Sequence, residues 1–174
     1  MNQENLKLLA SFVIIIILQV GVFNNMNLYE IINPSLYLII FLLYRTSFDK
    51  TLLILLGFVT GLIIDLTAQT YGCHTIATIT ICFTPGLLEN YFFGVNSNLP
   101  KAMISGTRLG NRLFFFLSII FIHQLIYFSL IFLSFSFINT IIFYTLLNNL
   151  YLTIYYKISH HLSFWTLFCK PILD

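Results

Sequence analysis

Charged residues are scarce in this chain: Asp, Glu, Lys and Arg together make up 8% of its 174 residues. Soluble domains carry about 25% charged residues, which keep their surfaces hydrated. Hydrophobic residues instead account for 59% of the chain, and its mean hydropathy is +0.93. The composition therefore excludes a soluble globule and predicts an integral membrane protein, whose length suits one membrane domain with little outside it.

The features of an enzyme or a metal protein are also missing from the sequence. Three scattered cysteines, Cys73, Cys82 and Cys169, form neither a disulfide framework nor a zinc-binding spacing. The sequence has no phosphate-binding Walker loop, no GxSxG nucleophile motif and no HExxH zinc motif. We therefore expect no enzymatic activity, no cofactor, no metal and no nucleic-acid partner.

Long apolar runs are what the chain does contain. A helix needs about 20 apolar residues to cross a bilayer core, and five segments meet or approach that length: residues 6–23, 51–67, 72–91, 113–135 and 138–156. A sixth, residues 28–44, is weaker because it contains Glu30 and Pro34. The prediction is an all-α bundle of six transmembrane helices that forms a single domain over residues 1–174, with the first span a retained signal anchor.

The positions of the basic residues support six spans. With the N-terminus inside, every connection that contains Lys or Arg falls on the cytoplasmic side, as the positive-inside rule requires. These residues are Lys7, Arg45, Lys50, Lys101, Arg108, Arg112, Lys157 and Lys170. Removing the span at residues 28–44 would break this pattern, so we keep it as a short, tilted or kinked helix. Both termini are predicted to be cytoplasmic.

One carboxylate lies inside an apolar run. Gly57, Gly61 and Asp65 are spaced four residues apart, which places them on one face of a helix. An Asp at the centre of a membrane helix costs roughly 2.5 to 3.5 kcal/mol unless a partner satisfies it, and glycines allow another helix to approach closely. We predict that these three residues form a packing face, either with the protein's own helices or with a partner span.

The partner of Asp65 must be a histidine, an amide, a hydroxyl, a backbone donor, water or another protein, because no Lys or Arg lies at its depth; alternatively the carboxyl is protonated. The short connection at residues 68–71 makes the third and fourth spans antiparallel neighbours. We hypothesise that His74, or the free backbone N–H groups at the start of the fourth helix, anchors Asp65. His123 is a candidate polar residue of the core. Together, His123 and Asp65 could also form a proton or ion relay. Because Asp65 is the only acid deep in a predicted span, we favour a structural contact over a relay.

Several short motifs resemble the rod shape-determining protein MreD family. They are the Pro-led second span Asn33-Pro34-Ser-Leu-Tyr-Leu-Ile-Ile, the GxxxGLxxD third span from Gly57 to Leu66, and Tyr71-Gly72-Cys73-His74 at the start of the fourth. The family pattern corresponds to Pro34, Gly57, Gly61, Asp65 and Gly72 of this chain. The resemblance implies a fold similar to the membrane substrate-binding component of energy-coupling-factor transporters, and it supplies no catalytic residue.

The same resemblance implies a non-enzymatic subunit of the bacterial cell-elongation complex in the cytoplasmic (inner) membrane, where it contacts membrane lipids. Its expected partners are an MreC-like single-span protein, a cell-wall glycosyltransferase and transpeptidase, and, indirectly, an actin-like filament. The alternative from another class is a small-solute or vitamin-binding transporter subunit. That function would need a ligand cavity near Asp65, His74 and His123.

Overall fold

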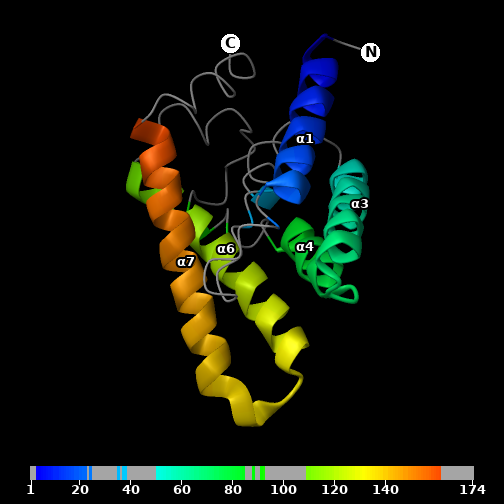
Figure 1. Cartoon of the computed structure of the whole chain (residues 1–174). Helices are drawn as coiled ribbons and strands as arrows, with labels where there is room; N and C mark the ends of the chain where they lie inside the picture. Colours follow the sequence, from blue (N-terminus) through cyan, green and yellow to red (C-terminus); the bar gives the residue numbers. More distant parts are fainter. Residues whose placement is uncertain are drawn as a thin grey trace.

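A computed structural model describes residues 3–22, 24, 35, 37–38, 50–84, 88, 91–92 and 109–161, and all regular structure among them is helical (Figure 1). The helices are α1 (Gln3–Gly21), α3 (Lys50–Ala68), α4 (Cys73–Phe83), α6 (Leu109–Phe132) and α7 (Ile138–His161), with a short 3-10 turn, η3 (Phe135–Phe137), between the last two. The all-α prediction is confirmed for these residues. The predicted span at residues 28–44 lies outside them, except for Ser35, Tyr37 and Leu38.

Three of the described helical segments are long and apolar enough to cross a membrane: Thr51–Ala68, Leu113–Phe132 and Phe135–Ile154. They agree with three of the predicted spans to within a few residues. Helix α4 ends at Phe83, inside the predicted span at residues 72–91. Pro85 follows shortly after this end, and proline lacks the N–H that an α-helix needs. Residues 85–87 lie outside the described part of the chain.

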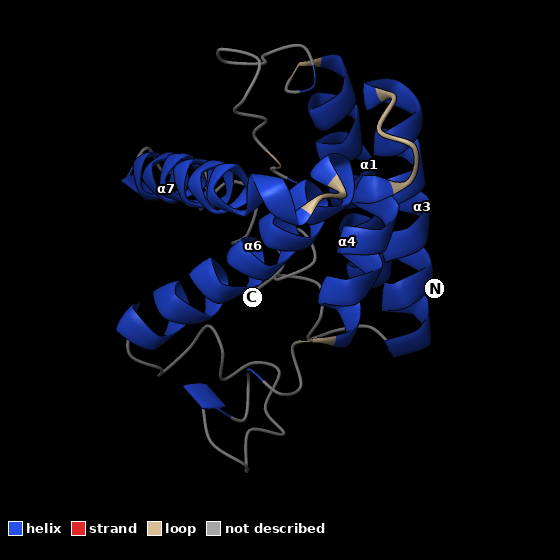
Figure 2. Ribbon diagram, turned by 90° about the horizontal axis from the view of Figure 1, so that it is seen from below, coloured by secondary structure: helices blue, strands red, loops and turns tan. Residues whose placement is uncertain are grey.

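The helices pack in a simple series in which α4 and α6 occupy the middle. Helix α3 packs against α1 on one side and α4 on the other, α4 also packs against α6, and α6 packs against α7. Figure 2 shows α6 between α7 and the group formed by α1, α3 and α4. In Figure 1, α1, α3 and α6 run from top to bottom, while α4 and α7 run back up. The start of α1 and the end of α7 therefore lie at the same end of the molecule.

Polar side chains gather in the interior, and large apolar side chains cover the outside. The buried polar residues are Gln19, Ser35, Thr60, Asp65, His74, Thr78, His123, Gln124, Thr145, Asn148 and Asn149. Helix α7 illustrates the pattern, because Asn148 is buried whereas Phe143 and Leu146 are more than half exposed. Exposure of such an apolar surface to water is unfavourable, whereas its contact with lipid tails is not. This distribution and the three long apolar helices identify a helical membrane protein.

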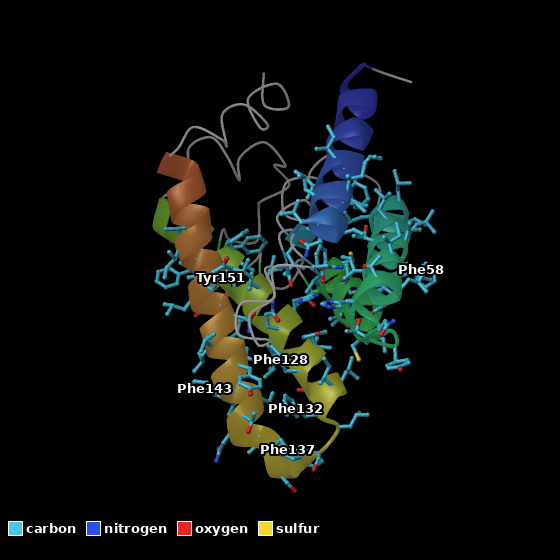
Figure 3. All side chains as sticks on the ribbon, viewed as in Figure 1. Phe58, Phe128, Phe132, Phe137, Phe143 and Tyr151 are labelled. Atoms are coloured by element: carbon cyan, nitrogen blue, oxygen red, sulfur yellow. The ribbon has the colours of Figure 1, made fainter. Side chains whose placement is uncertain are left out.

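Aromatic side chains follow the same division between outside and inside. Figure 3 shows Phe58 and Phe143 pointing away from the body of the molecule, on the outer sides of α3 and α7. Phe128 and Phe132 of α6 instead contact Tyr144 of α7, with ring centroids 5.6 and 5.9 Å apart. These inner aromatics join α7 to α6, whereas the outer ones suit contact with lipid tails.

Candidate functional site

A tight turn between α3 and α4 brings Asp65, near the end of α3, against the start of α4. The turn contains three residues with positive φ: Gln69 at 56°, Tyr71 at 51° and Gly72 at 93°. Gly72 is the N-cap residue of α4 and has a left-handed conformation. Since left-handed backbone is unfavourable for residues with a Cβ, contacts around the turn must hold Gln69 and Tyr71 in place.

Asp65 supplies those contacts. Its Oδ1 accepts hydrogen bonds from the Thr70 hydroxyl and from the backbone N–H of His74 at 2.9 Å. Its Oδ2 accepts from the Thr75 hydroxyl and from the backbone N–H of Thr75 at 2.8 Å. A carboxylate has about four acceptor positions, so these four donors satisfy it. Asp65 thus caps α4 from a neighbouring helix, where the exposed N–H groups and the helix dipole favour an anion.

We hypothesised that either His74 or the free backbone N–H groups at the start of the fourth helix anchor Asp65. The backbone N–H groups bind the carboxylate, so this alternative is confirmed. His74 contributes its backbone N–H to this contact, while its imidazole hydrogen-bonds to Tyr37. The two threonine hydroxyls were not singled out from the sequence. A hydroxyl in the turn and another at the third position of the following helix are the signal that could have indicated them.

Gly61 lies at a close approach of α3 and α4. A Cβ at this position would lie 2.5 Å from the Thr75 Cα, 3.0 Å from the Thr75 nitrogen and 3.2 Å from the His74 carbonyl oxygen. All three are backbone atoms, so a side-chain rotation could not relieve the clash. Gly57, one turn earlier, is also buried. Within the described residues, the glycine face of α3 therefore packs at Gly61 against the protein's own helix α4.

Gly72 has a different role from Gly61, because a Cβ built on it would meet nothing within 4 Å. Its requirement is conformational, since its φ is 93°. We expect Gly72→Ala to destabilise the protein by about 1–2 kcal/mol, the cost of left-handed backbone in a residue with a Cβ. Gly72→Asn should cost less, because Asn tolerates this region better. Thermal unfolding of both variants in detergent tests this, and equal stability of the Ala variant and wild type would contradict it.

A second buried polar cluster lies deeper in the bundle and joins α4 to α6 through Tyr37. The Tyr37 hydroxyl is 3.1 Å from His74 Nδ1 and 2.8 Å from His123 Nε2. The Tyr127 ring is stacked on the His74 ring, with centroids 4.2 Å apart. Next to His123, the Gln124 amide donates to the Ser35 hydroxyl at 3.4 Å. As predicted, His123 faces the interior of the bundle.

Sequence reasoning missed Tyr37, although this residue connects the two candidate histidines. The chain contains ten tyrosines, and Tyr37 lies in the predicted span with the weakest signal, three residues after Pro34. Nothing in the local pattern distinguishes it from the others. Pro34, which belongs to the MreD-like pattern, lies outside the described residues.

The described residues contain no group of three or more His, Cys, Asp or Glu side chains that could hold a metal ion. The arrangement is therefore a pair of polar anchors in a helical membrane protein: a carboxylate that caps a helix, and a His–Tyr–His cluster that joins helices. Comparisons with protein-family models, curated proteins and solved structures find no match for this chain.

Proposed function

We propose that this chain is a non-enzymatic membrane subunit of a bacterial cell-elongation complex, as its resemblance to the MreD family implies. In this proposal it crosses the cytoplasmic (inner) membrane six times with both termini in the cytoplasm. It binds and positions an MreC-like single-span protein and, directly or through it, a cell-wall glycosyltransferase and transpeptidase. An actin-like filament is linked only indirectly.

The observation that carries the proposal is that Gly61 and Asp65, two residues of the MreD-like pattern, make structural contacts within the chain. Asp65 is bound by donors from the α3–α4 turn and the start of α4, and Gly61 lies against the Thr75 backbone. Residues used in this way build a helix pair rather than a reaction centre. The start of α1 and the end of α7 lie at the same end of the molecule in Figure 1, which is compatible with an even number of crossings.

Affinity purification from native membranes tests this function. The full chain, tagged at its C-terminus, would be solubilised in a mild detergent, and proteins that accompany it would be identified by mass spectrometry. We expect a single-span protein and a cell-wall synthase at levels above those found with an equally tagged, unrelated multispan protein. Purification of the chain without these proteins would contradict the proposal.

A small-solute or vitamin-binding transporter subunit is the second candidate, and the His–Tyr–His cluster favours it. Ligand sites in helical bundles commonly place a few polar groups in an otherwise apolar interior, and Tyr37, His74 and His123 are all buried. The same purification separates the two functions. Recovery of an ATP-hydrolysing transport module in place of the cell-wall proteins would favour the transporter subunit.

A further inference from the structure

The described residues do not fill the hydrogen-bonding capacity of the cluster formed by Tyr37, His74 and His123. The phenol oxygen of Tyr37 contacts one nitrogen of each histidine, His74 Nδ1 and His123 Nε2. The far nitrogens of the two rings, His74 Nε2 and His123 Nδ1, are buried and have no hydrogen-bond partner among the described residues. An unsatisfied buried polar atom is unfavourable, so a group that fills these positions would stabilise the bundle.

The number of available hydrogens decides what kind of group fits. A phenol carries one hydrogen, and a neutral imidazole carries one on either of its two nitrogens. The single phenol hydrogen cannot serve both contacts to the Tyr37 oxygen, so at least one histidine must donate its near N–H to that oxygen. The far nitrogen of that ring then has a free lone pair. At least one of the two unpartnered nitrogens is therefore a hydrogen-bond acceptor.

We infer that the interior of this bundle contains a binding site for a small hydrogen-bond donor at His74 Nε2 and His123 Nδ1, at least one of which is an acceptor. The occupant carries O–H or N–H groups; water and the hydroxyl or amide of a small organic molecule share this chemistry. A metal ion is less suitable, since the described residues offer no group of three or more metal-binding side chains. The Tyr127 ring, stacked on His74, covers one face of that imidazole and leaves its edge to bind the donor.

Nitrogen NMR of the full chain in lipid nanodiscs tests the site. Only four histidines are present, so replacing His160 and His161 by Gln leaves the two of interest, labelled with ¹⁵N. We expect at least one ring to be protonated on the nitrogen that faces Tyr37, which is Nδ1 of His74 or Nε2 of His123; removing one histidine at a time assigns the two rings. We also expect the unprotonated far nitrogen of that ring to resonate upfield of a free imidazole nitrogen, because it accepts a hydrogen bond from the occupant. A far nitrogen at the free position, or no ring protonated toward Tyr37, would overturn the inference.

Two preparations distinguish the source of the donor. One is purified from native membranes, and the other is made by cell-free synthesis into nanodiscs of a synthetic lipid. An upfield shift in both identifies water, and a shift only in the native preparation identifies a cellular small molecule. Absence of the shift from both overturns the site. Tyr37→Phe should change the tautomer of at least one ring, whereas Tyr91→Phe, at an exposed tyrosine, should leave both spectra unchanged.

Discussion

Replacing Asp65 by Asn is expected to lower the thermal unfolding midpoint of the purified chain by roughly 6–12 °C, the shift that about 3 kcal/mol produces in a protein of this size. The carboxylate accepts four hydrogen bonds, two of them from backbone N–H groups at the start of α4. An Asn side chain keeps one acceptor oxygen and turns an NH₂ group toward donors that need an acceptor. Hydrogen bonds to a charged group contribute about 1.5–3 kcal/mol each. Asp65→Asn should therefore lower the free energy of unfolding by more than a substitution of an ordinary surface residue does.

Two further variants make this result specific to the cap. Thr75→Val removes one hydroxyl donor but keeps the backbone N–H, so its effect should lie between those of wild type and Asp65→Asn. Leu66→Ala changes the next residue, which is 73% exposed, and should have little effect. Unfolding followed by intrinsic fluorescence or by aggregation of detergent-solubilised protein measures all three. An Asp65→Asn variant as stable as Leu66→Ala would show that the carboxylate does not hold α4.

Replacing Gly61 by Leu is expected to prevent close packing of α3 on α4 and to abolish binding of partner proteins. Even the single Cβ of Ala would lie 2.5 Å from the Thr75 Cα, and overpacking of a tight contact costs roughly 1–3 kcal/mol. Leucine adds three more carbon atoms in the same place. Because Thr75 also donates to Asp65, moving its backbone away from Gly61 would disturb the cap of α4 as well.

Gly110→Ala is the matched control for this prediction. Gly110 is also helical, it is exposed, and a Cβ there would meet nothing within 4 Å. In a helix, Ala is favoured over Gly by up to about 1 kcal/mol, so this variant should unfold at the same temperature as wild type or slightly higher. Gly61→Ala should unfold clearly lower. Equal midpoints for Gly61→Ala and wild type, or normal partner recovery with Gly61→Leu, would contradict the close approach or its importance for assembly.

The helical class and the approximate bounds of the long apolar helices followed from the sequence, because they depend on local composition. A run of apolar residues that long has no other stable form in a bilayer, since only a helix satisfies its own backbone there. Helix α4 ends at Phe83, shortly before Pro85, whereas the apolar run continues to residue 91; apolar content by itself does not show where one helix ends.

The position of Asp65 also followed from local information. Its partner was predictable only because the connection to α4 is so short that the free N–H groups of that helix had to lie nearby. The cluster around Tyr37 is a different case, since Tyr37 is 37 residues from His74 and 86 residues from His123. No local pattern specifies which of many tyrosines will meet two histidines from distant helices.

The sequence by itself determined that this chain is a membrane protein made of helices, that one acid must find a partner, and that Gly57 and Gly61 share its face. Composition and the helical repeat suffice for these conclusions, because both act over a few neighbouring residues. Only the tertiary structure decided that α4 covers the glycine face at Gly61 and that His74 and His123 meet through one phenol. Those contacts depend on the packing of whole helices, which fixes distances between residues far apart in the chain.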